Sequence, residues 1–260
     1  MIDCLSIFKQ QSDKDNSMQA LVVKNRFRGP PHSGNGGYVG GLFSKIVDPS
    51  SKGCVEVTLR SPIPLDVPLQ ANQMDDGSAT VTDGETLIAQ MKSIDLAMDV
   101  PAPPAWTDVE AVAEKSLAYS SDINELLPGQ RGFHPICFCC GIEHDTGLQV
   151  CVASVGDQVA AIWKTKESWG LADGLLPIEY LWTAMDCPGQ FAYMEKGIRT
   201  GMLGRITASV TEQPKAGEEL LVTAWTILVE GKKHFAGAAI FDRHGKLYSK
   251  AKTVWIGRRD

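Results

Sequence analysis

Apolar and polar residues alternate along much of this chain, which is the pattern of half-buried β-strands. In the first half, the alternation predicts strands at residues 18–23, 54–60, 78–81 and 86–95, with a hairpin turn at residues 82–85 (TDGE). In the second half, it predicts strands at residues 148–153, 158–164, 205–210, 219–229, 234–242 and 246–256. Each half therefore contains a predicted antiparallel meander.

A helical pattern interrupts the strands of the first half. It follows a loop at residues 26–37 (RFRGPPHSGNGG), whose glycines and prolines exclude regular structure. Gly40 and Gly41 lie inside the predicted helix, where a glycine costs about 1 kcal/mol relative to alanine. We therefore expect another element to pack very close to this helix. Its apolar face consists of Tyr38, Val39, Leu42, Phe43, Ile46 and Val47.

A second helical pattern lies in the second half, at residues 176–191 (LPIEYLWTAMDCPGQF). Asp186 directly follows its apolar face, and an acid in that position is costly to bury unless it is paired or has a function. Pro188 lacks an N–H and would clash with the preceding turn, so we expect the helix to kink or stop there. The apolar face consists of Ile178, Leu181, Trp182 and Met185.

The same order of elements occurs twice: a strand, a Gly/Pro-rich loop, an apolar helix and a meander. One helix with one antiparallel meander makes a complete small α+β unit. Residues 100–107 (VPAPPAWT) are typical of a Pro-rich linker, so the boundary falls between residues 100 and 132. We predict an N-terminal domain with its linker at residues 1–126 and a C-terminal domain at residues 127–260.

Composition excludes several classes of partner. The net charge is −6 and no Lys/Arg-rich run occurs, which argues against nucleic acid. No apolar run approaches the ~20 residues of a membrane span, and residues 1–18 lack the pattern of a signal peptide. The cysteines number seven, so we expect reduced thiols in a cytoplasmic protein. An anionic coenzyme is still compatible with this charge, because backbone amides at a helix start can hold it.

Three local motifs resemble sequences of hotdog-fold thioesterases. Residues 32–37 (HSGNGG) resemble the HGG-type loop before the helix, and residues 184–187 (AMDC) resemble the helix position that carries an Asp or Glu. Residues 137–141 (CFCCG), with residues 146–148 (TGL), are similar to the CFxCG…GL opening of many hotdog domains. The motifs, in this order, resemble the double-hotdog acyl-CoA thioesterases over about residues 18–98 and 134–257.

This resemblance implies an α+β fold of two tandem hotdog domains, each a long antiparallel sheet wrapped around a central helix, packed as an intrachain pseudo-dimer. It also implies an acyl-CoA thioesterase with its site between the halves. The amides of Gly36 and Gly37 would form the oxyanion hole, and Asn35 would orient the carbonyl or cap the helix. Asp186 would be the general base for water or, as the less favoured option, a nucleophile.

Other residues of this implied site are less well matched. One branch of the family uses an Asp, a Thr and a Gln, and here Asp186 and Thr226 match the first two. The strand expected to carry the Gln reads residues 250–253 (KAKT), without a Gln. We expect His32, Tyr38 and Trp182 to contact substrate, although a Trp is more often a core residue and a loop His more often lies on the surface.

The same residues are compatible with several other interpretations. Asp186 could be a capping or ion-paired acid, and the glycines could serve only a turn or a helix contact. The missing Gln favours a degenerate hotdog protein that binds acyl-CoA or another apolar ligand without turnover. A hotdog hydratase would use a His with an acid at the helix start, and the second helix has no His.

A short segment of the second half contains residues of the types that bind zinc. His134, Cys137, Cys140 and His144 are the ligand types of zinc, but no second, distant Cys pair follows them, so we predict neither a metal nor a cofactor. A catalytic Cys187 is disfavoured because the preceding carboxylate would raise its pKa. We expect one catalytic site, since the first helix lacks a matching acid, in a monomer or a homodimer.

Overall fold

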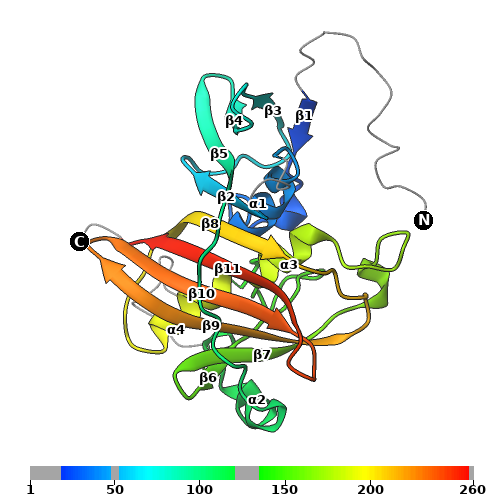
Figure 1. The fold of residues 1–260 in the computed structure, drawn as a ribbon, viewed down its shortest axis with the longest axis vertical. Helices are drawn as coiled ribbons and strands as arrows, with labels where there is room; N and C mark the ends of the chain where they lie inside the picture. Colours follow the sequence, from blue (N-terminus) through cyan, green and yellow to red (C-terminus); the bar gives the residue numbers. More distant parts are fainter. Residues whose placement is uncertain (1–18, 48–52, 121–134, 258–260) are drawn as a thin grey trace.

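The computed structural model describes residues 19–47, 53–120 and 135–257 (Figure 1). The strands are β1 (Gln19–Val22), β2 (Cys54–Leu59), β3 (Pro68–Gln73), β4 (Ala79–Asp83), β5 (Thr86–Ile94), β6 (Ala153–Val155), β7 (Gln158–Lys164), β8 (Met202–Val210), β9 (Glu219–Glu230), β10 (Lys233–Phe241) and β11 (Leu247–Ile256). The α-helices are α1 (Gly36–Ser44), α2 (Trp106–Val112), α3 (Ile178–Ala184) and α4 (Cys187–Met194).

All these strands belong to one antiparallel sheet of eleven strands. Their order is β1-β3-β4-β5-β2-β8-β11-β10-β9-β7-β6. Strands β2 and β8 pair in the middle, with Val55 opposite Ala208 and Thr58 opposite Arg205. This pairing makes the strands before α2 and those after it parts of the same sheet (Figure 1).

Helices α1, α3 and α4 pack on the sheet and on one another. Helix α1 contacts β2 and β8, α4 contacts β7, β9 and β10, and α1 packs directly against α3. The close approach predicted at Gly40 and Gly41 is confirmed. A Cβ added at Gly41 would lie 2.6 Å from the Cα of Glu179, and one at Gly40 would lie 2.9 Å from the Trp182 ring.

The second helical pattern forms two helices rather than one. Helix α3 ends at Ala184, and Pro188 is the second residue of α4. A proline there needs no N–H partner, because the first N–H groups of a helix have none. The break expected at Pro188 therefore occurs two residues earlier, and Asp186 lies in the junction between the two helices.

Two strand predictions differ from the structure. Residues 148–152 form no strand, because this segment bonds to the loop at residues 137–141: the Leu148 N–H donates to the Phe138 carbonyl and the Val150 N–H to that of Cys139. Strand β3 was not predicted, because it is largely polar and only Leu69 in it is buried, so it lacks a buried, apolar alternation.

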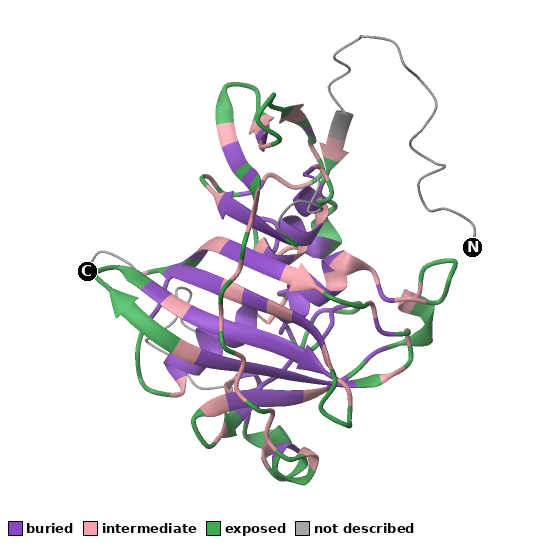
Figure 2. Cartoon of the chain, viewed as in Figure 1, coloured by how far each residue is buried: buried purple, intermediate pink, exposed green. Residues whose placement is uncertain are grey.

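The Pro-rich segment before α2 packs on the sheet. In Figure 1 it crosses in front of β8, β11, β10 and β9, on the face opposite to α4. Met98, Val100 and Trp106 pack against a small cluster on this face that includes Trp225 and Phe241. Figure 2 shows that the middle of the sheet is buried and that exposure is concentrated in the hairpin ends and in α2. No helix among the described residues has the length and hydropathy needed to cross a membrane.

An ion pair ties α1 to α3 and leads to a first prediction. The Lys45 ammonium contacts the carboxylate of Glu179, a residue only 8% exposed. Lys45→Met leaves that carboxylate without its cation, so we expect the free energy of unfolding to fall by about 1–3 kcal/mol. Lys164→Met, which removes an exposed pair with Glu219, should cost no more than about 1 kcal/mol in the same urea titration. Equal losses in the two variants would contradict the argument.

Candidate active site

Asp186 connects the α3–α4 junction to the start of α1. Its side chain is 2% exposed and makes no hydrogen bond to its own helix, although it occupies the N-cap position of α4. Instead, Oδ2 accepts a hydrogen bond from Gly37 N–H at 2.9 Å and one from Asn35 Nδ2 at 3.0 Å. Asp186 therefore does not cap α4, and its partners come from residues about 150 positions earlier.

Asn35 holds both α1 and Asp186 with one side chain. Its Oδ1 accepts a hydrogen bond from Tyr38 N–H at 2.8 Å, which caps α1, while its Nδ2 donates to Asp186. The two roles use opposite ends of the amide, so the orientation of Asn35 is fixed from both sides. Asn35 is 2% exposed, and its amide orients a carboxylate as well as capping the helix.

The two oxygens of Asp186 have different surroundings. Oδ2 carries both hydrogen bonds, whereas Oδ1 is buried and has no partner among the described residues. Burial raises the pKa of Asp186 to about 7, and the thiol of Cys137 also raises it. The Gly37 N–H and the Asn35 amide act in the opposite direction, because they stabilise the ionised form.

A cavity of about 500 Å³ lies beside Asp186. Its volume is in the range of small-molecule sites. Asn35, Gly36 and Asp186 line it together, which places the start of α1 and the acid of the α3–α4 junction on one cavity. The loop at residues 29–34 and the loop after β2 also contribute to the wall. The large apolar side chains of the wall are Ile63 of that second loop and, from the ends of central strands, Leu59, Met202, Leu203, Trp255 and Ile256.

The two glycines predicted to form the oxyanion hole differ in whether their backbone N–H already has a partner. Gly37 is buried, does not line the cavity, and donates its N–H to Asp186, so this amide is not free for a substrate oxygen. Gly36 lines the cavity, and no partner for its N–H is found among the described residues. The Gly37 N–H therefore fixes the acid, whereas the Gly36 N–H belongs to a residue of the cavity wall and has no partner in the described part of the chain.

Of the three residues expected to contact substrate, one lines the cavity and two do not. His32 is exposed and lines the cavity. Tyr38 stacks on Phe27 with ring centroids 3.7 Å apart, and Trp182 is 2% exposed between α1 and the sheet. Tyr38 and Trp182 are not part of the cavity wall, so the structure makes them packing residues.

Thr226 lies away from Asp186, which corrects its predicted place in the site. Its hydroxyl accepts a hydrogen bond from Lys196 Nζ at 2.8 Å, and the residue does not line the cavity. The spacing of strands along the sequence does not reveal where Thr226 lies in the sheet relative to the cavity. We expect Thr226→Val to change the rate of any reaction in the cavity by less than about 3-fold, because no reacting atom is near. A steady-state assay of the variant checks this, and a 100-fold loss would restore the residue to the site.

Sequence reasoning missed Gln190. This residue lies one turn after Asp186 on α4, is 6% exposed and lines the cavity, and its Nε2 donates to the Gly201 carbonyl at 3.0 Å. Its spacing of four residues from Asp186 was the available signal, because residues i and i+4 share a helix face. No Gln was expected there, since the family resemblance pointed to residues 250–253 of β11.

Of the four residues that the sequence offers as zinc ligands, His144 does not join Cys137 and Cys140. His134 lies outside the described residues. His144 has both ring nitrogens occupied, Nε2 by the Arg26 carbonyl at 2.7 Å and Nδ1 by Thr146 N–H at 3.2 Å. Cys137 and Cys140 do lie close together, and Cys187 of α4 joins them.

Comparisons with known proteins bear on the fold. No family model matches the sequence, and no curated protein matches it. Among solved structures, the chain resembles a candidate thioesterase II from Thermobifida fusca, with a TM-score of 0.57, 12% identity, and coverage of 93% of this chain and 97% of that one. It also resembles a candidate thioesterase from Novosphingobium aromaticivorans, with a TM-score of 0.55, 13% identity, and coverage of 97% and 100%.

A third solved structure is named for its fold. It is a conserved protein of unknown function with the hotdog fold from Alicyclobacillus acidocaldarius, with a TM-score of 0.55, 11% identity, and coverage of 95% of this chain and 96% of that one. Identities this low carry information about fold rather than activity. Since the likeness extends over nearly the whole chain, the protein described here has the hotdog fold.

Proposed function

We propose that this protein is a thioesterase that hydrolyses acyl-CoA in the cavity beside Asp186. The observation that carries the proposal is the pairing of Asp186 with the start of α1: two donors hold Oδ2, while Oδ1 and the Gly36 N–H are left without partners among the described residues. A fixed acid and a free amide on one cavity are the two parts that thioester hydrolysis needs.

We propose that the chain is a pseudo-dimer of two tandem hotdog domains, residues 1–126 and 127–260. The strand order supports this: outward from the β2–β8 pairing, the strands follow in the order β2-β5-β4-β3-β1 on one side and β8-β11-β10-β9-β7 on the other, so corresponding strands of the two halves take corresponding places. Each set follows the pattern of first strand, helix, second strand and meander. The cavity would then lie between the two domains.

The proposed reaction uses water as the nucleophile. Asp186 Oδ1 takes a proton from a water molecule while the water oxygen attacks the thioester carbon. The carbonyl electron pair moves to its oxygen, which the Gly36 N–H stabilises together with the positive end of α1. The tetrahedral intermediate then breaks its C–S bond, and the leaving thiolate takes the proton from Asp186. The products are a carboxylic acid and CoA, and Asp186 is again a carboxylate.

The test is a panel of acyl-CoA esters of increasing chain length, assayed for free CoA with a thiol reagent. We expect CoA release that saturates with substrate for at least one chain length. If no chain length gives CoA above the uncatalysed rate, the proposal fails.

A second candidate function is binding of acyl-CoA without turnover. It is favoured by the occupied Gly37 N–H and by the lysines at residues 250 and 252, in the strand where the family resemblance expects a Gln. Calorimetric binding of a non-hydrolysable acyl-CoA thioether, combined with no CoA release from the esters, would select this alternative.

A further inference from the structure

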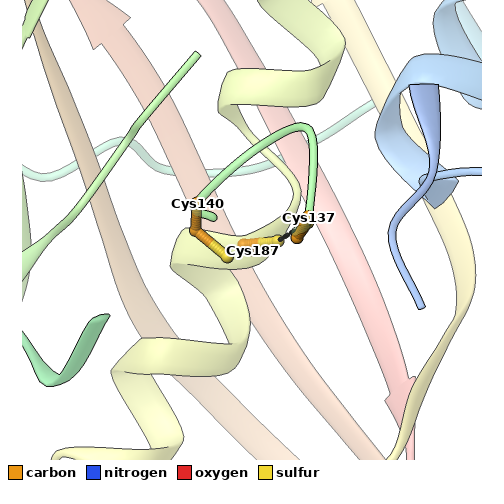
Figure 3. Close-up of side chains that lie close together, drawn as sticks. All are labelled: Cys137, Cys140 and Cys187. Atoms are coloured by element: carbon orange, nitrogen blue, oxygen red, sulfur yellow. Dashed lines mark hydrogen bonds between the residues drawn. The ribbon is translucent and has the colours of Figure 1, made fainter. Parts of the chain in front are cut away.

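Three buried cysteine sulfurs gather next to the cavity wall. The Sγ atoms of Cys137, Cys140 and Cys187 lie within 4.8 Å of one another. Figure 3 shows that Cys137 and Cys140 extend from the two ends of one loop that arches over the start of α4, and that Cys187 of α4 lies between them with its sulfur directed toward Cys137. Cys137 is 2% exposed, Cys140 1% and Cys187 6%. The thioesterase mechanism proposed above uses none of these thiols.

The loop has the Cys-x-x-Cys-Gly form in residues 137–141 (CFCCG). The Gly141 N–H closes the turn on the Cys137 carbonyl at 2.8 Å. A Cβ at Gly141 would lie 2.4 Å from the Cys137 nitrogen and 2.5 Å from the Pro135 carbonyl, so only glycine fits the turn. The tight turn brings Cys137 and Cys140 to the same side, as two ligands of one ion require.

We propose that Cys137, Cys140 and Cys187 bind a zinc ion. Zn–S bonds of ~2.3 Å in a tetrahedral site place two sulfurs about 3.8 Å apart, and the sulfurs of Cys137 and Cys187 are 3.8 Å apart. Thiolates are favoured ligands of zinc. The Asn35 Nδ2 lies 3.7 Å from the Cys137 sulfur and can donate to it, which is the kind of outer contact that stabilises a metal-bound thiolate.

The nearby cysteines have other partners. Cys139 Sγ donates to the Thr183 carbonyl at 3.0 Å, and Cys151 Sγ donates to the Cys140 carbonyl at 3.7 Å. Cys187 is thus the third protein ligand, in place of His144. Cys137 and Cys187 line the cavity, so the remaining position of a tetrahedral site goes to a water molecule from that side.

Binding converts three thiols to thiolates. Three S–H bonds ionise, three S–Zn bonds form, and the protons leave to solvent. Zinc would fasten the loop to the first residue of α4, directly after Asp186, and so hold the α3–α4 junction in place.

The test measures metal on the whole protein. Wild-type chain purified under reducing conditions, loaded with zinc and dialysed against metal-free buffer should retain about one zinc ion per chain by mass spectrometry. Cys187→Ser and Cys140→Ser should each retain at least ~10-fold less zinc. The matched control is Cys54→Ser, another buried cysteine but in β2, which should retain as much as wild type.

If the cysteine variants fail to fold, cobalt binding to the wild-type protein still tests the proposal. Cobalt added to the wild-type protein should produce a thiolate-to-cobalt charge-transfer band, and zinc should abolish it by displacement. Wild-type protein that holds less than about 0.1 zinc per chain and shows no such band would overturn the proposal. A Cys137–Cys187 disulfide in protein kept under reductant would overturn it as well. Loss of CoA release alone would bear on the proposed function and not on this site.

Discussion

Asp186→Asn should lower the kcat for acyl-CoA hydrolysis by about 100-fold or more, with little change in KM. Asn35 Nδ2 and Gly37 N–H are both donors, so they will hold the carbonyl oxygen of the new amide in the place of Oδ2. The NH₂ group is then forced into the position of Oδ1, the oxygen that has no partner among the described residues and that takes the proton in the proposed reaction. A donor there cannot accept a proton from water, although the shape of the site is unchanged.

The measurement is steady-state release of CoA from the best ester of the panel, with thermal unfolding of each variant. Asp83→Asn is the matched control, because it makes the same change at an exposed turn at the end of β4, and its rate should equal that of wild type. A folded Asp186→Asn variant with a rate within about 3-fold of wild type would remove Asp186 from the mechanism. The cavity could then still bind acyl-CoA without turning it over.

Most of the fold was predictable because its strands carry strong local patterns. Strands β2, β5, β7 and β9 follow the predicted ranges closely, since each alternates or forms a buried run between turn residues. Strand β3 was missed because its sequence, PLQANQ, is polar and its burial is irregular. Residues 148–153 were predicted as a strand from their alternation, but residues 148–152 are buried and bond to the loop at residues 137–141 instead.

Parts of the site were predictable because some residues cost free energy in the predicted helices unless a partner or a close contact compensates for them. An acid beside an apolar helix face, with a proline two positions later, indicated that Asp186 has partners elsewhere. Glycines in a helix indicated close packing, and the structure places α3 there. Thr226 could not be placed, because the register and order of strands depend on long-range pairing that period-two patterns do not encode.

The cluster of Cys137, Cys140 and Cys187 was also not predictable from local patterns alone. The pair Cys137 and Cys140 is local, so its spacing was visible in the sequence. Cys187 lies 50 residues away, and only the packing of the loop on α4 brings it to the pair. Local spacing instead suggested His144, which the fold directs to the Arg26 carbonyl. A metal site assembled from two distant segments therefore has to be found in three dimensions.

Gly37→Ala should destabilise the protein by about 3 kcal/mol or more. Its Cβ would lie 2.6 Å from the Cβ of Asp186, 2.7 Å from the Trp182 carbonyl oxygen and 2.9 Å from the Cα of Thr183. Two of these atoms belong to the backbone of α3 and cannot rotate away, so α1 and α3 must separate. The gain in helix propensity from alanine is only about 1 kcal/mol, so the clash outweighs it and the free energy of unfolding falls.

Gly36→Ala is the matched control for stability, because it changes the preceding residue of the same helix. Its Cβ would approach the Leu203 side chain, at 2.7 Å from Cδ2, and that end of a flexible chain can move. We therefore expect the free energy of unfolding of Gly36→Ala, measured by urea titration, to fall by no more than about 1 kcal/mol. Separation of α1 from α3 also pulls the Gly37 N–H away from Asp186, so Gly37→Ala should lose at least ~10-fold in kcat even at temperatures where it is folded. If Gly37→Ala were as stable as Gly36→Ala and as active as the wild-type protein, the contact between α1 and the Asp186 junction would not be what holds the acid in place.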